Sequence, residues 1–293
     1  MDRISEFILS KRWECLWMWL PKLEYGHRDC SEPESKRLQC FLDRNLPLHR
    51  APVIESFRLK LISSRFKSEN INLWVAIAVS HCLRELEILY ESNGFVINTP
   101  ALKYFKLMDH NYRSHNCLIE HMPNLIEAHL DVELTDMKSI IGSITSVKRL
   151  TMCCSQTMLD QGFVFNQLEH LDLCLCAPLF PDQLFRLLKA SSKLKRLHLF
   201  FMNSDHYPQE DMDDWNQPST VPECILSSLQ SLSWSKYTGE PQEREVVVYI
   251  LKHALHLKTA TIKSSESEVP KFEMLKELAL SSRASATCQL MFE

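Results

Sequence analysis

Apolar residues return along this chain in a fixed phrase, in which one apolar residue is followed by a second three places later and by a third two places after that. The position between the second and third is usually polar. Ten phrases occur in order, and they are Ile54-Phe57-Leu59, Leu83-Leu86-Ile88, Leu102-Phe105-Leu107, Leu125-Ala128-Leu130, Val147-Leu150-Met152, Leu168-Leu171-Leu173, Leu194-Leu197-Leu199, Leu229-Leu232-Trp234, Leu257-Ala260-Ile262 and Leu275-Leu278-Leu280. One phrase alone would carry no information because leucine is common, whereas ten phrases in order predict a repeating fold.

The spacing of the phrases indicates which repeat this is. Their first residues lie 18 to 35 residues apart, close to the period of roughly 20–29 residues that is typical of leucine-rich repeats. The alternation of apolar and polar positions predicts strands with one buried face. The sequence therefore predicts an α/β leucine-rich-repeat solenoid, in which a curved parallel sheet carries helices and loops on its convex side. Helices are expected over residues 70–82, 114–122, 135–145, 181–190 and 242–256.

The same alternation predicts both the core and the outward side chains. Leu171, Leu173, Leu197 and Leu199 should be nearly fully buried, whereas the second, fourth and sixth residues after each first apolar residue should face outward. The outward candidates for binding a protein target are Glu85, Glu87, Tyr104, Lys106, Glu127, His129, Arg149, Thr151, His170, Asp172, Arg196, His198 and Phe200. Leu89, Met108, Asp131, Cys153 and Cys174 occupy further outward positions. Such a mixture of charged, aromatic, Met and Arg side chains suits protein recognition, and an ordinary solvated sheet face is the alternative.

Composition narrows the classes of function. The 293 residues carry a net charge of −4, which gives no support for binding nucleic acid, since that usually needs a basic stripe. No stretch is apolar for long enough to span a membrane, and the first residues do not read as a signal peptide. The eleven cysteines show no regular disulfide framework, so we expect buried, reduced thiols in an intracellular protein of the cytoplasm or nucleus.

Candidate chemistry is sparse. Cys153 and Cys174 should lie on neighbouring strands, but their spacing is not that of a zinc site. The five glycines are never clustered as a phosphate-binding loop requires, and no nucleophile elbow occurs. We therefore expect no catalytic residue, no metal and no cofactor. An unrecognised hydrolase that uses His170 and Asp172 is the alternative from a different class of function.

Two segments depart from the repeat pattern. Residues 1–25 are rich in aromatic side chains and have a helical pattern, and Ser35 is a candidate cap for a helix that runs to about Leu46. Residues 203–222 contain five acidic side chains and no Lys or Arg. We expect this acidic segment to be a solvated loop that leaves the edge of the sheet, with a specific acidic binding element as the alternative.

Three regions of the chain resemble the plant F-box/FBD/leucine-rich-repeat proteins. The run SKRWECLWMWLPKLEY at residues 10–25 is similar to the closing part of a plant F-box, and FLDRNLPLHRAPVIESFRLKL at residues 41–61 is similar to the entry into the repeats. The C-terminal region resembles the FBD module. Its matching positions are Trp215, Pro218, Val221, Pro222, Glu223, Cys224, Leu229, Trp234, Tyr237, Thr238, Gly239, Glu245, Tyr249, Ile250, Leu251, Ala254, Leu257, Met274, Leu275, Leu278, Arg283, Ser285, Cys288, Gln289 and Leu290.

The resemblance implies an order of domains and a mechanism. It implies an F-box remnant over 1–25, leucine-rich repeats over 26–204 and an FBD-like region over 205–293 that continues the solenoid. It also implies a non-catalytic, substrate-binding subunit of a cullin-based ubiquitin ligase, in which Trp13, Leu16 and Trp17 contact a Skp-type adaptor and the repeats hold a target protein. Only nine residues precede Ser10, so about half of the family's F-box pattern is missing. Two alternatives follow: the three side chains form only a terminal cap for the repeats, or the chain is a scaffold that has lost its ligase coupling.

Overall fold

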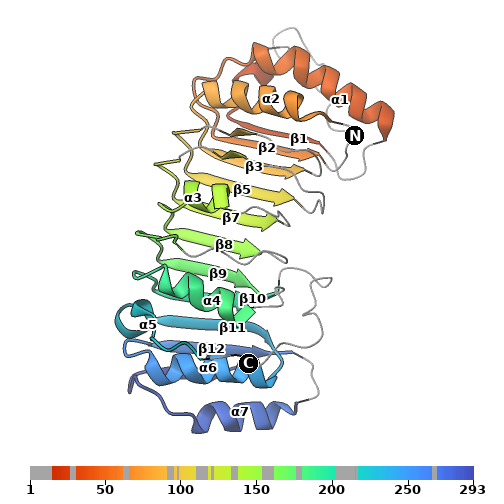
Figure 1. Ribbon diagram of the computed structural model, residues 1–293. Coiled ribbons are helices and arrows are strands. Elements are labelled where there is room, and N and C mark those ends of the chain that lie inside the picture. Colours follow the sequence, from red (N-terminus) through yellow and green to blue (C-terminus); the bar gives the residue numbers. More distant parts are fainter. Residues whose placement is uncertain are drawn as a thin grey trace. The chain divides into compact units, whose positions relative to one another are not determined.

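The computed structural model divides the chain into two compact units, Met1–Leu125 and Ile126–Glu293. The residues that it describes are 15–26, 31–61, 66–90, 96–97, 99–109, 118–119, 122–132, 138–153, 162–175, 180–201, 215, 217–265 and 269–293. Within each unit, Figure 1 shows the strands side by side and running in the same direction, with helices in the connections. The α/β leucine-rich-repeat class predicted from the sequence is therefore confirmed, and each unit is described below by itself.

The first unit contains one parallel sheet, with its strands in the order β1-β2-β3-β5, and a separate short parallel pair, β4 and β6. Its helices pack on the same core, and the indole Nε1 of Trp74 in α2 donates a hydrogen bond of 2.9 Å to Asp43 in α1. The elements are η1 (Leu16–Trp19), β1 (Lys22–Gly26), α1 (Glu32–Asn45), η2 (Leu46–Leu48), β2 (Ser56–Leu61), α2 (Ser68–Ser80), β3 (Glu85–Tyr90), β4 (Val96–Ile97), β5 (Tyr104–Asp109) and β6 (Leu118–Ile119).

The second unit contains a parallel sheet with its strands in the order β7-β8-β9-β10-β11-β12-β13. The helices α4, α5, α6 and α7 each contact the next one along the chain. The elements are β7 (Glu127–Val132), α3 (Lys138–Ser143), β8 (Arg149–Cys153), β9 (His170–Cys174), α4 (Phe180–Lys189), β10 (Arg196–Phe200), α5 (Glu223–Ser227), β11 (Ser231–Tyr237), α6 (Pro241–His253), β12 (Thr259–Ser264), α7 (Lys271–Leu280) and β13 (Gln289–Phe292).

The repeat phrase sets the register between neighbouring strands. In the first unit Phe57 aligns with Leu86, which in turn aligns with Phe105. In the second unit Leu171 aligns with Leu197, and Leu173 aligns with Leu199. These four leucines are at most 2% exposed, so their predicted burial is confirmed. Equivalent apolar residues therefore form continuous buried rows across each sheet, and these rows are the core of the repeats.

The last phrase, Leu275-Leu278-Leu280, was wrongly predicted to be a strand, because it lies in the helix α7. Met274 and Leu278 are the buried residues of α7, whereas Leu275 is 41% and Leu280 is 77% exposed. Burial four residues apart is the period of a helix that packs one face on its neighbours. The final strand of the unit is instead β13, whose residues pair with those of β12.

The N-terminal part of the first unit also differs from the prediction. Residues 22–25 were expected to be helical, but they belong to β1, which pairs with β2. Gly26 closes this strand with a φ of +102°, and a Cβ there would lie 2.1 Å from the carbonyl oxygen of Lys60. A larger residue would clash with the neighbouring strand at this point, so Gly26 permits the pairing of β1 with β2 along its whole length.

The predicted helix boundaries are accurate to a few residues in most cases. The helix α1 begins earlier than expected, because Ser31 rather than Ser35 caps it, in a reciprocal capping box with Glu34. Residues 118–119 of the helix expected over 114–122 form the strand β6 instead. Trp13 and residues 203–214 of the acidic segment lie outside the described residues. None of the described helices is long and apolar enough to cross a membrane.

Candidate protein-binding surface

The predicted outward side chains lie on the strands of both units, and the first two outward positions of each strand are accessible. Glu85, Arg149 and Arg196 are exposed. The other members are half-buried, and they are Glu87, Tyr104, Lys106, Glu127, His129, Thr151, His170, Asp172, His198 and Phe200. Half-burial is expected on a sheet, because each side chain is flanked by the equivalent side chains of the neighbouring strands.

The third outward position does not behave as predicted. Leu89, Asp131, Cys153 and Cys174 are all buried, and only Met108 and Phe200 remain half-buried there. Cys153 and Cys174 form a small apolar cluster on which Phe200 packs. Apolar side chains on adjacent strands shield one another from water, so this row stabilises the sheet and offers little accessible surface to a partner.

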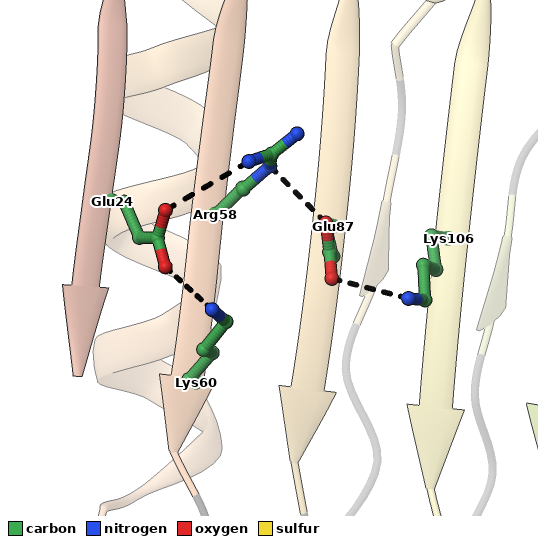
Figure 2. Close-up of polar contacts among 5 residues, drawn as sticks. All are labelled: Glu24, Arg58, Lys60, Glu87 and Lys106. Carbon is green, nitrogen blue, oxygen red and sulfur yellow. Dashed lines mark hydrogen bonds and ion pairs between the residues drawn. The ribbon is translucent and has the colours of Figure 1, made fainter. Parts of the chain in front are cut away.

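In the first unit the outward charges form a continuous set of ion pairs, which we call the charge ladder and define as Glu24, Arg58, Lys60, Glu87 and Lys106. Figure 2 shows these five side chains on β1, β2, β3 and β5. Glu24 accepts a short hydrogen bond from Lys60, and its other oxygen lies 3.8 Å from Arg58 Nη1. Arg58 Nε lies 3.1 Å from Glu87, whose second oxygen lies 3.3 Å from Lys106 Nζ.

The charge ladder favours the ionised form of Glu24. The hydrogen bond from Lys60, together with the charges of Lys60 and Arg58, holds the pKa of Glu24 below its usual value, although partial burial opposes this shift. Three members, Glu24, Arg58 and Lys60, were absent from the predicted set. Arg58 and Lys60 stand four and six places after Ile54, so the same counting rule applied to the first phrase would have found them. Glu24 was missed because β1 was not predicted.

The second unit carries a looser set of polar contacts. Arg149 Nε donates a hydrogen bond of 2.7 Å to Glu127 on the neighbouring strand. His170 lies between Arg149 and Arg196 in the register of the sheet. Burial and the positive charges of Arg196 and Arg149 lower the pKa of His170. For Arg196 itself, which is exposed, the described residues provide no ion pair.

Asp172 contacts a different histidine from the one proposed for a hydrolase. His198 Nδ1 lies 3.4 Å from Asp172 Oδ1, while Thr151 donates a hydrogen bond of 3.4 Å to the other carboxylate oxygen. The opposite ring nitrogen of His198 lies 3.1 Å from the hydroxyl of Ser235 on β11. The order of a hydroxyl, an imidazole and a carboxylate is that of a nucleophile, its base and the group that orients the base. His170 does not take part in this line of contacts.

Metal binding gains no support from the described part of the chain, where no group of three or more His, Cys, Asp and Glu side chains converges. The described cysteines are free thiols. Cys224 illustrates the buried ones, because burial raises the pKa of its thiol to about 12 and its Sγ donates a hydrogen bond to the carbonyl oxygen of Leu188. Such thiols act as small apolar groups in the core rather than as ligands or nucleophiles.

The proposed adaptor-binding residues are placed only in part. Leu16 and Trp17 lie in η1, where Leu16 is 47% exposed and Trp17 is half-buried. The carbonyl oxygen of Met18 in η1 accepts hydrogen bonds from the backbone N–H groups of Arg50 and Ala51, at 2.7 and 3.1 Å. This segment is therefore attached to the chain that leads into β2, while the Leu16 side chain remains accessible.

The parallel sheets with buried leucine rows and accessible polar rows define the class of the leucine-rich-repeat proteins, within which comparison with known proteins is specific. The family model named FBD matches residues 217–262. An FBD-associated F-box protein of Arabidopsis thaliana is 42% identical, with 99% of this chain and 94% of the relative covered. A putative FBD-associated F-box protein of the same plant is 40% identical, with coverage of 99% and 93%. This chain belongs to the family of FBD-associated F-box proteins.

A third relative extends the comparison to the repeats. An F-box/FBD/LRR-repeat protein of Arabidopsis thaliana is 30% identical, with 100% of this chain and 94% of the relative covered. The alignment with the relative that is 42% identical runs over 388 positions, more than the 293 residues of this chain, so segments of that relative have no counterpart here. No solved structure shows significant similarity to the chain.

Proposed function

We propose that this protein is the target-binding subunit of a cullin-based ubiquitin ligase of the F-box type. The observation that carries the proposal is the arrangement of accessible polar side chains in register on consecutive strands, in a chain that belongs to an F-box family. Rigid strands that hold many side chains in fixed positions can match the surface of a folded target or of an extended segment. The mechanism is proximity: the repeats hold the target, an adaptor connects them to the ligase, and other subunits transfer ubiquitin.

The adaptor contact is assigned to the N-terminal segment. Leu16 and Trp17 offer apolar surface next to η1, and Trp13 belongs to the same sequence phrase. The direct test is binding of a purified Skp-type adaptor to the full chain and to the variant Leu16→Asp, measured by calorimetry. Leu226→Asp is the control, because Leu226 in α5 is also an exposed leucine, at 40% against 47% for Leu16.

Three outcomes separate the proposal from the scaffold alternative. Adaptor binding that is lost in Leu16→Asp and kept in Leu226→Asp supports ligase coupling through the N-terminal segment. Adaptor binding that both variants keep would contradict the assignment of Leu16. No adaptor binding by the unaltered chain, together with no ubiquitin transfer to a bound target in a reconstituted ligase, would leave the repeat scaffold as the function.

A hydrolase is the second candidate, because Ser235, His198 and Asp172 lie in the order that nucleophilic catalysis uses. Against it stands the exposure of the pair, since the side chains of His198 and Asp172 are 39% and 46% accessible. Water at such a site weakens the electrostatic stabilisation on which acyl transfer depends. A fluorophosphonate probe decides the matter: labelling of Ser235 that disappears in Ser235→Ala would support a hydrolase, and the absence of labelling would exclude activated nucleophilic chemistry at this serine.

A further inference from the structure

One edge of the sheet in the second unit carries a concentration of positive charge that the repeat pattern did not predict. It lies where the strands begin, and we call it the basic edge. Its members are Lys148 and Arg149 at β8, Lys195 and Arg196 at β10, and Lys258 before β12. The whole chain has a net charge of −4, so this positive edge is a local departure from the composition of the protein.

Backbone hydrogen bonds place Lys148, Lys195 and Lys258 at equivalent positions on alternate strands, and Arg149 and Arg196 each stand one residue later. Glu169 N–H donates to the carbonyl oxygen of Lys148, and Lys195 N–H donates to that of Glu169. The series continues through Gln230 to Lys258, with hydrogen bonds of 2.8 Å at both steps. Adjacent strands lie roughly 4.8 Å apart, so the five strands from β8 to β12 carry these positions along a line of about 19 Å.

The charges in this line are close enough to act on one another. Glu169 is hydrogen-bonded to Lys195, and that contact together with the charges of Lys195 and Lys148 holds the pKa of Glu169 below its usual value. Burial, together with the positive charges of Arg196 and Arg149, likewise lowers the pKa of His170. These effects show that the cations of β8 and β10 share one electrostatic environment around β9, although their side chains start from different strands.

The nearby carboxylates do not neutralise the basic edge. Glu127 is occupied by Arg149 at 2.7 Å, and Glu169 is occupied by Lys195 at 3.1 Å. For Lys148, Arg196 and Lys258, all exposed, the described residues provide no ion-pair partner. Three cations on alternate strands are therefore available to a ligand, at intervals of roughly 10 Å.

A hydroxyl group adds a further donor beside Arg196, one residue after the row of Lys148, Lys195 and Lys258. Ser231 aligns with Arg196 in the register of β10 and β11. The hydroxyl of Ser231 accepts a hydrogen bond of 3.1 Å from Thr259, so its own hydrogen is directed elsewhere and can be donated to an acceptor. The row thus offers positive charge and a hydrogen-bond donor side by side, which is the chemistry that recognises carboxylate groups.

We propose that the basic edge binds an acidic, extended segment of the target protein, with Asp or Glu side chains that contact Lys148, Arg196 and Lys258. A line of about 19 Å corresponds to roughly six residues of extended chain, and alternate residues of such a segment project to the same side. This inference rests on the proposed function, because it names the chemistry of the target that the repeats would hold.

The test uses the full chain and a fluorescein-labelled peptide of twelve residues in which Glu and Ser alternate. A peptide with Gln in place of Glu is the neutral control. We expect the acidic peptide to bind, the neutral peptide not to bind, and the affinity to fall as salt rises. Arg196→Glu should weaken binding roughly fivefold, and the double variant Lys148→Glu, Arg196→Glu should weaken it by about tenfold or more. Lys252→Glu is the matched control, since Lys252 is an exposed lysine in the helix α6.

The outcomes decide between this inference and its rivals. Failure of the acidic peptide to bind, or equal loss of binding in Arg196→Glu and Lys252→Glu, would overturn it. A single-stranded RNA of similar length that displaces the peptide at lower concentration would reassign the edge to nucleic acid. If Arg196→Glu lowers the unfolding midpoint, Arg196→Gln replaces it, and unchanged binding by that variant would count against the inference.

Its failure can be separated from failure of the proposed function. If a target is captured and ubiquitinated but is insensitive to Lys148→Glu and Arg196→Glu, the function stands and the basic edge is wrong. If the acidic peptide binds as expected but the chain binds no adaptor, the basic edge stands and the ligase role is wrong.

Discussion

The outward faces of the two units are built from the same repeat phrase, but they use their charges differently. In the first unit Glu24, Arg58, Lys60, Glu87 and Lys106 pair with one another along the charge ladder. In the second unit some pairs form, yet Lys148 and Arg196 have no ion-pair partner among the described residues. The strands of both units pair in parallel through the same repeat phrase, so the difference lies in the side chains that they carry.

This difference in ion pairing affects how readily each face can bind a charged partner. A partner that approached the charge ladder would have to compete with ion pairs that are already formed, and Glu87 is only 17% accessible within it. A partner of the second unit would meet the exposed cations Lys148 and Arg196, which have no ion pair among the described residues and whose charge can attract it. We therefore expect the charge ladder to stabilise the fold and the basic edge to bind a partner.

Burial of the repeat leucines should contribute equally to the free energy of unfolding in both units. Loss of such a leucine is the largest effect that we expect. Leu59 in the first unit and Leu173 in the second occupy the same place in their phrases and are 0% and 2% exposed. Leu59→Ala and Leu173→Ala should each lower the free energy of unfolding by about 2–5 kcal/mol, because each removes a buried side chain and leaves a cavity. Chemical denaturation measures this, and a cost below about 1 kcal/mol in either variant would show that the two rows are not equivalent cores.

Acidic side chains in the two units should give opposite dependences on pH. Burial raises the pKa of Glu243 to about 7 from its usual 4.5, even though Thr238 and Gly239 donate hydrogen bonds to it. A raised pKa means that folding favours the protonated carboxyl, so this contribution is complete below about pH 4.5 and is lost as the pH rises through about 7. The pKa of Glu24 is lowered, so its contribution is present above its unfolded pKa and is lost as the pH falls.

Two neutral variants test these signs. In Glu243→Gln the amide oxygen can still accept a hydrogen bond, but it cannot ionise. The unaltered protein should therefore lose on the order of 1–3 kcal/mol of stability relative to this variant between about pH 5 and about pH 8. Glu24→Gln should instead reduce the loss of stability at acid pH. The measurement is the free energy of unfolding of each protein across this pH range. The raised pKa of Glu243 would be contradicted if Glu243→Gln left the dependence of stability on pH unchanged at neutral pH.

The charge ladder itself should contribute less than the core. Glu87→Gln removes the carboxylate that pairs with Arg58 and Lys106 and should cost about 1 kcal/mol, because the site is only partly shielded from water. Glu85→Gln is the matched control on the same strand, since Glu85 is exposed and forms no ion pair with any other described residue. It should change stability by no more than about 0.5 kcal/mol. Equal costs for the two variants would mean that the ladder adds nothing measurable.

The strands could be predicted from the sequence because the alternation of apolar and polar residues is a local pattern. Nine of the ten phrases coincide with strands, from β2 to β12, since alternation over a few residues directly reports which side chains face the core. The last phrase failed because α7 satisfies two patterns at once. Leu275-Leu278-Leu280 has the spacing of a strand, while Met274 and Leu278 have the spacing of a helix, and packing selected the second.

The pairing of charges could not be read from the sequence in the same way. Glu24 and Lys60 are 36 residues apart, and their contact depends on the pairing of β1 with β2 and on the conformations of two long side chains. The basic edge was missed for another reason. Lys148, Lys195 and Lys258 directly follow the first apolar residue of their phrases, a position that counting in steps of two along a strand leaves out.

A reversal of charge at one outward arginine in each unit offers the most delicate test of the comparison. Arg58 stands at the centre of the charge ladder, whereas Arg196 is exposed and has no ion pair within the described part of the chain. Arg196→Glu should therefore alter the free energy of unfolding by no more than about 0.5 kcal/mol. Arg58→Glu should cost more, because it places three carboxylates together on neighbouring strands. Thermal or chemical unfolding of the two variants under one buffer condition checks this order.

Binding should show the reverse order. If Arg196 is a central anchor for a target, Arg196→Glu should cost the bound target about 1 kcal/mol or more while leaving the fold intact. Lys263→Glu is the control, because Lys263 is an exposed lysine on β12 that already pairs with Glu293 at 2.8 Å. Equal binding by the Arg196 and Lys263 variants would refute the central part of this face as the recognition surface. The contacts with the target would then have to be sought in the loops or the helices.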